Sequence, residues 1–174
     1  MEQEQLSHRQ TRWTTQAFPL ILACNDWQDP RNVGMAFRLA DAFGVEAIWL
    51  GGTTPVPPNR KISKTARSTD GWVPFVHQPH LAQALTEAKA QQYTLIGVEI
   101  TNQSKALDDY LKEGVPQPTI LVLGAEQSGI SREVLEVLDG CVHIPMYGRN
   151  SSLNVATALA IALSAWVSRW QESK

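Results

Sequence analysis

The sequence of 174 residues has only two cysteines, no surplus of positive charge and no apolar run long enough to cross a membrane. Cys24 and Cys141 lie in separate apolar runs, outside any C-x-x-C or Cys/His pattern, so we expect neither a disulfide framework nor a cysteine metal site. The formal net charge of −2 excludes a global attraction to nucleic acid or anionic membranes, so any such binding must be local.

The N-terminal residues also lack the apolar centre of a secretion signal. We therefore expect residues 1–19 to be a tail, and residues 20–174 to be a single domain of the reducing cytoplasm. The most apolar stretch, residues 153–167, is shorter than the ~20 residues of a membrane span, which predicts a buried helix and no membrane partner.

Several nucleotide and hydrolase motifs are missing as well. No G-x-G-x-x-G follows the first predicted strand, and neither a G-x-x-x-x-G-K-[ST] loop nor a G-x-S-x-G elbow occurs. Dehydrogenase, P-loop and serine-hydrolase functions therefore lose most of their support. Only two histidines are close in sequence, and they flank a proline, so we expect no metal site; the four are His8, His77, His80 and His143.

What the sequence does contain is an alternation of short apolar runs with helical patterns. Such an alternation, with most runs continuously apolar, predicts an α/β domain with a mainly parallel sheet and helices on both faces. The helices are expected to start at Pro30, near Pro79, at residues 107 and 131, and at residue 156. The six expected strands are residues 20–24, 45–50, 72–76, 93–98, 120–123 and 142–144.

Polar loops follow three of these strands, at residues 25–32, 124–129 and 144–154. In parallel sheets the ligand crevice lies beyond the carboxyl ends of the strands, so the three loops are expected to converge there. The same rule places Glu99, just past the fourth strand, where its carboxylate could accept hydrogen bonds from a ribose diol; the alternative is a surface acid.

The last loop runs directly into the C-terminal helix, where unpaired backbone amides can bind a polar or anionic ligand. Ser151 and Ser152 are suitable N-caps, so an ordinary strand-to-helix turn is the alternative. On the first helix, Arg38 follows Asn32 by six residues, close to two turns, so both are expected to face the crevice. The alternative for Arg38 is an ion pair with Asp41, three residues later.

The three loops together resemble the motifs of the SpoU (TrmH) family of RNA ribose 2′-O-methyltransferases, in the SPOUT superfamily. The first motif is DPRNVGMAFR, residues 29–38, continued by ADAFG at residues 40–44. The second is LVLGAEQSGI, residues 121–130, and the third joins IPM at residues 144–146 to SLNV at residues 152–155. The resemblance extends from about Leu20 to Val167.

The resemblance implies S-adenosylmethionine as methyl donor, a deep trefoil knot in the C-terminal part of the sheet, and a homodimer with active sites near the subunit interface. A dimer would suit the small side chains of the last helix, although a buried helix without a dimer role is the alternative. These alanines are Ala156, Ala158, Ala160, Ala162 and Ala165.

The family pattern also implies roles for individual residues. Arg38 would activate the ribose 2′-hydroxyl, and Asn32 would position Arg38 or the ribose. Glu126 would hold Asn32 or the active-site loop, Ser152 would act at the substrate phosphate or orient Arg38, and Asn154 would shape the knot. The implied cofactor-binding residues are Gly124, Ile144, Met146 and Leu153, together with Glu99.

RNA affinity would have to come from local basic surfaces, since the net charge is negative. Four positive charges occur within residues 60–67, although a solvated surface segment is the alternative. The sequence thus predicts a methyltransferase of structured RNA, with tRNA favoured over rRNA. A non-catalytic RNA- or nucleotide-binding module and another α/β small-molecule enzyme remain the competing interpretations. The expected RNA-binding residues are Arg31, Arg60, Lys61, Lys64, Arg67 and Arg149.

Overall fold

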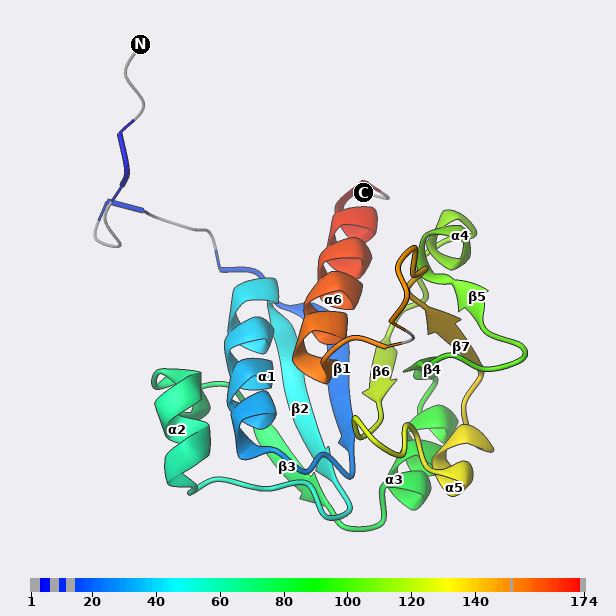
Figure 1. The fold of residues 1–174 in the computed structure, drawn as a ribbon, viewed down its shortest axis with the longest axis horizontal. Coiled ribbons are helices and arrows are strands. Elements are labelled where there is room, and N and C mark those ends of the chain that lie inside the picture. The colour runs from blue at the N-terminus through cyan, green and yellow to red at the C-terminus, as the bar shows by residue number, and fades with distance from the viewer. Residues whose placement is uncertain (1–3, 7–9, 12–14, 151, 173–174) are drawn as a thin grey trace.

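The computed structural model describes residues 4–6, 10–11, 15–150 and 152–172, and its strands form one sheet in the order β3-β2-β1-β6-β4-β7-β5 (Figure 1). Every pair of neighbouring strands in this sheet is parallel. The predicted α/β architecture with a parallel sheet is therefore confirmed. The strands are β1 (Phe18–Asn25), β2 (Val45–Gly51), β3 (Phe75–Gln78), β4 (Thr94–Val98), β5 (Lys105–Ala106), β6 (Thr119–Leu123) and β7 (Gly140–His143).

The sheet has seven strands where the sequence predicts six. The additional strand, β5, is only two residues long and pairs with β7 at the edge of the sheet. Two residues, one of them lysine, are too few for a periodic pattern, so the prediction missed it. The third strand begins at Phe75 instead of Trp72, because the chain leaves the 3₁₀ helix η1 (Thr69–Gly71) through a turn in which the Trp72 and Val73 N–H groups donate to the Thr69 carbonyl.

Helices cover both faces of the sheet (Figure 1). Alternate residues of β1 show this division: Leu20 and Leu22 pack in the core beneath α1 and α6, whereas Ile21 and Ala23 pack in the core beneath α3 and α5. The helices are α1 (Pro30–Phe43), α2 (Arg60–Ala66), α3 (Leu81–Ala90), α4 (Leu107–Lys112), α5 (Arg132–Leu135) and α6 (Val155–Glu172).

Helix α1 begins and ends with the residue types that the sequence indicates. The Asp29 side chain accepts a hydrogen bond from the Arg31 backbone N–H at 2.9 Å, and Pro30 follows at the first helical position. Gly44 ends the helix in a left-handed conformation with φ of 65°, which glycine adopts without steric cost. Within α1, a Cβ on Gly34 would lie 2.6 Å from the Ile62 carbonyl oxygen, so only glycine lets α2 pack this closely.

Helix α6 is buried along one side by large apolar residues, among them Leu159, Leu163 and Trp166. It packs against α1 and α4. Within the described ranges, no helix is both long and apolar enough to cross a membrane.

The registers of the central strands bring three chain segments to one edge of the sheet. Cys24 of β1 aligns with Leu50 of β2 and with Leu123 of β6, so these strands end side by side. The loops that follow β1 and β6 therefore start from the same edge, as the strand pattern predicts.

Candidate active site

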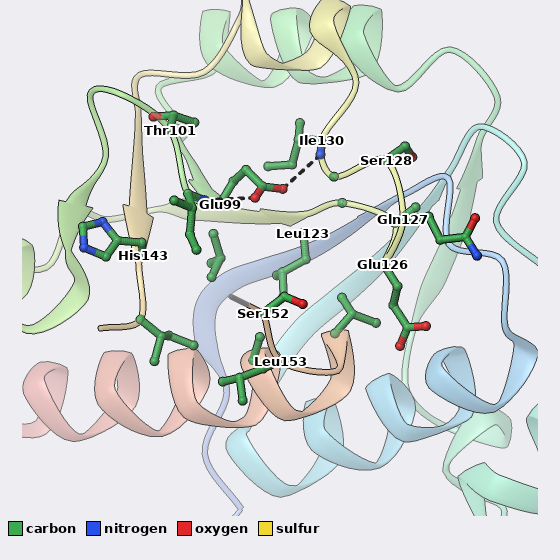
Figure 2. A pocket seen from close by; sticks show the side chains of 18 of the residues that line it. Glu99, Thr101, Leu123, Glu126, Gln127, Ser128, Ile130, His143, Ser152 and Leu153 are labelled. Atoms are coloured by element: carbon green, nitrogen blue, oxygen red, sulfur yellow. Dashed lines mark hydrogen bonds between the residues drawn. The ribbon is translucent and has the colours of Figure 1, made fainter. Parts of the chain in front are cut away.

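A cavity of about 500 Å³ lies at this carboxyl edge of the sheet (Figure 2). Its walls come from the end of β4, the loop after β6, the end of β7 and the segment that leads into α6. The volume is in the range of small-molecule sites in proteins.

All five residues that the resemblance assigns to the cofactor line this cavity. Figure 2 shows Glu99 on the β4 side and Leu153 on the α6 side of the same space. The remaining three are Gly124, Ile144 and Met146. The structure thus brings together positions that lie up to 54 residues apart in the sequence, from 99 to 153.

The loop after β6 is tightly folded and depends on glycine. The Ala125 N–H donates to the Gly129 carbonyl at 3.1 Å, and the Gly129 N–H donates back to the Ala125 carbonyl at 2.8 Å. A Cβ on Gly124 would collide with the backbone of Gly129 and Ile130. Gly129 has φ of 66°, which disfavours any other residue there. This wall of the cavity is therefore fixed by backbone contacts.

Glu99 connects the end of β4 to that loop. One carboxylate oxygen accepts a hydrogen bond from the Ile100 N–H at 2.9 Å, and the other accepts one from the Ile130 N–H at 3.2 Å. Each carboxylate oxygen has about two lone-pair sites, so each can still accept a hydrogen bond from a hydroxyl group. Glu99 is half-buried, and the alternative of a freely solvated surface acid does not describe it.

Beside the cavity, Asn32, Glu126 and Asn154 form a cluster of polar side chains. The Asn32 amide donates to Glu126 Oε1 at 2.9 Å. The Asn154 amide donates to Asn32 Oδ1 at 3.3 Å and makes a short hydrogen bond to the same Glu126 oxygen. One residue from each of the three motifs is therefore held to the other two.

Asn154 is also the N-cap of α6, which corrects the expectation that a serine caps this helix. Its Oδ1 accepts hydrogen bonds from the Ala156 N–H at 3.0 Å and the Thr157 N–H at 3.3 Å. Ser152 is exposed and lines the cavity, where Figure 2 shows it next to Leu153. Ser151 lies outside the described residues. The serine that remains near the cavity is thus available for a ligand.

Arg38 lies apart from this cluster. Six residues correspond to a rotation of about 600° around a helix, so Arg38 points roughly 120° away from Asn32. Asn32 is buried and Arg38 is exposed, and neither residue lines the cavity. The expectation that both residues face one crevice therefore fails within a single chain, because six residues fall short of the 7.2 that complete two turns.

The predicted alternative for Arg38, an ion pair with Asp41, is not formed either. Asp41 Oδ1 instead accepts a hydrogen bond from the Trp72 indole N–H at 2.7 Å. Among the described residues, Arg38 has no hydrogen bond or ion pair. Its guanidinium is thus available to a ligand or to another chain.

Two of the predicted RNA-binding residues on α2 and one on α1 face a common notch of about 480 Å³ between the helices. The three cations are Arg31, Lys61 and Lys64. Arg31 donates two hydrogen bonds to Asp29 Oδ2, at 2.9 and 2.7 Å, and this contact lowers the pKa of Asp29 and raises that of Arg31. The other predicted residues are exposed outside the notch: Arg60, Arg67 and Arg149.

The cysteines and histidines do not form a reactive or metal site in the part of the chain that the structure describes. Burial raises the pKa of Cys24 and, with less burial, that of Cys141, so neither thiol is an activated nucleophile. The prediction assigned no site role to His143, which lines the cavity and whose Nδ1 lies 3.0 Å from Ser104 Oγ. Its place beside Ile144, at the end of a predicted strand, was the available signal.

Comparison with known sequences gives a family for this site. The model of the SpoU rRNA Methylase family matches residues 19–164. The 23S rRNA (guanosine-2′-O-)-methyltransferase RlmB of Vibrio parahaemolyticus is 34% identical over 145 residues, which cover 83% of this chain and 57% of that protein. The tRNA (guanosine(18)-2′-O)-methyltransferase TARBP1 of Mus musculus is also 34% identical, over 83% of this chain and 9% of its own length. The chain thus spans only part of these relatives.

Solved structures share the fold. The SpoU methyltransferase AviRb from Streptomyces viridochromogenes, solved in complex with the cofactor AdoMet, has a TM-score of 0.78 and 26% identity, over 90% of this chain and 62% of that chain. The TrmH/SpoU tRNA modifying enzyme of A. aeolicus has a TM-score of 0.81 at 24% identity, over 91% of this chain and 79% of that chain. The family model that matches residues 19–164 and the similarity to RlmB lead to one conclusion: this chain belongs to the SpoU rRNA Methylase family.

Proposed function

We propose that this protein transfers a methyl group from S-adenosylmethionine to a ribose 2′-hydroxyl of a structured RNA. The observation that carries this proposal is the hydrogen-bonded cluster of Asn32, Glu126 and Asn154 beside a cavity of about 500 Å³. The functions of the relatives support it, because these proteins are named as methyltransferases of RNA ribose 2′-oxygens.

The cavity suits S-adenosylmethionine in size and chemistry. Apolar walls from Leu123, Ile144 and Leu153 offer a surface for adenine, and Glu99 keeps lone pairs for a ribose diol. The tight loop 124–130 leaves backbone groups at the cavity wall. The AviRb structure in complex with AdoMet supports this assignment. When bound, the cofactor supplies an electrophilic methyl group.

The residues of the chain then have to position the attacking oxygen and assist removal of its proton. Ser152 lines the cavity and can donate to or accept from the substrate, while the cluster fixes Asn32 at its edge. Arg38 assists loss of the hydroxyl proton. An arginine is normally protonated and cannot itself take up this proton, so a phosphate oxygen of the bound RNA would accept it while the guanidinium stabilises the negative charge that develops on the ribose oxygen.

The position of Arg38 supports a homodimeric enzyme. Arg38 is exposed on α1 and does not line the cavity of its own chain. We infer that a second copy of the chain brings Arg38 and a cavity together. This arrangement would explain why one chain holds the cofactor positions and the catalytic arginine on different surfaces.

RNA would approach over the basic residues of α1, α2 and the loop before α6. The notch between Arg31, Lys61 and Lys64 carries three positive charges and one carboxylate, which suits a backbone phosphate. Arg60, Arg67 and Arg149 extend the positive surface around it. We retain tRNA as the first candidate and rRNA as the second.

Two further proposals come from the family. The first is that the segment leading into α6 forms a trefoil knot with the loop after β6; the contact of Asn154 with Glu126 brings these segments together and supports it. The second is a cytoplasmic location, which suits the two free thiols, Cys24 and Cys141.

Two measurements test the proposed activity. Calorimetry should show one S-adenosylmethionine bound per chain, and labelled cofactor should label cellular tRNA or rRNA at a ribose. Cofactor and RNA binding without any methyl transfer would indicate the non-catalytic module instead. Absence of cofactor binding would favour a different α/β enzyme and overturn the proposal.

A further inference from the structure

Trp72 makes a specific polar contact although it is largely outside the core. It follows η1 and is 59% exposed, and its indole N–H donates to Asp41 Oδ1 on α1 at 2.7 Å. Asp41 is therefore held toward the segment after η1, away from the rest of its own helix.

This contact matters because Asp41 lies one turn after Arg38. An arginine and a carboxylate three residues apart on a helix are neighbours and commonly pair. The structure contains no such pair: Asp41 contacts Trp72, and no ion pair of Arg38 occurs within the described ranges. The two oppositely charged groups remain separate although the helix places them in reach of one another.

We propose that Trp72 is a positioning residue for Arg38. By holding the Asp41 carboxylate, the indole N–H keeps the Arg38 guanidinium unpaired and available to an RNA phosphate and the ribose hydroxyl. The inference rests on the proposed function, because an unpaired Arg38 matters for the reaction only if Arg38 contacts the RNA substrate. It adds a residue outside the three motifs to the residues on which the reaction depends.

The test is the substitution Trp72→Phe, which removes the N–H and keeps an aromatic ring. Asp41 then becomes free to pair with Arg38, and kcat/KM should fall by about twofold to fivefold, as expected for a competing surface ion pair. The double variant Trp72→Phe/Asp41→Asn should recover most of the loss, because asparagine carries no charge. Trp49→Phe, at a partly buried position that packs against the core on the other face of the sheet, serves as the matched control for loss of an indole.

A second readout does not depend on activity. In protein labelled with ¹⁵N-arginine, Trp72→Phe should shift the Arg38 Nε–H resonance and slow its exchange with water, and the Asp41→Asn addition should reverse both changes. Raising the salt concentration should also bring the ratio of variant to wild-type kcat/KM toward one, because screening weakens exposed ion pairs.

Four results would overturn the proposal. The first is wild-type activity and an unchanged Arg38 resonance in Trp72→Phe, and the second is a loss that Asp41→Asn does not recover. The third is normal activity in Trp72→Phe with loss in Trp72→Leu, which would show that the ring itself stacks on an RNA base. The fourth is a changed sedimentation coefficient without an Arg38 shift, which would place Trp72 in contact with a second copy instead. Absence of methyl transfer by the wild type would refute the proposed function. The Arg38 Nε–H resonance in Trp72→Phe would still show whether Trp72 keeps Asp41 from pairing with Arg38.

Discussion

Asn32 and Glu126 are 94 residues apart in the sequence, and their side chains are joined by a hydrogen bond of 2.9 Å. Asn32 is buried, whereas Glu126 is exposed and lines the cavity. The bond therefore connects the core of α1 to the wall of the proposed cofactor site. Asn154 contacts both side chains, so one carboxylate organises residues from α1, from the loop after β6 and from the segment before α6.

Substitution of Asn32 tests this cluster. Asn32→Ala leaves Glu126 with one amide donor fewer, and we expect the free energy of unfolding to fall by about 1 to 3 kcal/mol. Methyl transfer should fall at least about tenfold, because the edge of the site loses its fixed position. Denaturant unfolding and kcat/KM check the two effects. Asn102→Ala, in an exposed turn, is the control and should change neither.

Asn154 has two functions that different substitutions can separate. Asn154→Ala removes the cap of α6 and the contact with Glu126, so stability should fall by about 1 kcal/mol and activity should be lost. Asn154→Ser keeps a capping oxygen and loses the amide donor. We expect it to recover the stability in thermal unfolding without recovering activity. Recovery of both would show that the cap alone is required.

Gly124 tests the wall of the cavity. A methyl group at Gly124 would collide with the backbone of Gly129, so Gly124→Ala should displace the loop and weaken cofactor binding by about tenfold or more in calorimetry. Gly140→Ala is the matched control, because nothing lies within 4 Å of a Cβ at that position. Equal affinity in the two variants would exclude the loop from the cofactor site.

Asp29 gives a prediction for the pH dependence of stability. Its hydrogen bonds with Arg31 lower its pKa below the usual 3.8, so the ionised folded state is favoured. The resulting stabilisation is fully present above the pKa of the unfolded chain and is lost as the pH falls through the lowered pKa. Asp29→Asn keeps the cap without the charge and should reduce the free energy of unfolding by about 0.3 to 1 kcal/mol at pH 7. This difference should vanish in acid; a difference that persists at pH 2 would point to a cause other than charge.

The sequence predicted those parts of the fold that local patterns specify. The cap at Asp29, the proline at position 30 and the stop at Gly44 define α1 through short-range hydrogen bonds and backbone preferences. The continuous apolar run in β1 predicts burial on both faces, and its residues pack in two separate cores. The converging loops follow from the rule for parallel strands.

What the sequence could not predict depends on contacts across the fold. The two-residue strand β5 exists only because β7 pairs with it. The Trp72–Asp41 hydrogen bond joins residues 31 positions apart, and no local pattern relates them. Asn154 caps α6 in place of a serine because its amide also contacts Asn32 and Glu126. The rotation between Asn32 and Arg38 was available from helix geometry, so the sequence alone could have prevented this error.

The most direct test of the central claim is methyl transfer by the purified protein, with the modified atom identified. Wild-type protein, labelled S-adenosylmethionine and cellular RNA should yield a ribose 2′-O-methyl group at a defined nucleotide. Arg38→Ala should bind the cofactor with unchanged affinity and lose the transfer by at least about a hundredfold. A methyl group on a base, or full transfer by Arg38→Ala, would contradict the account.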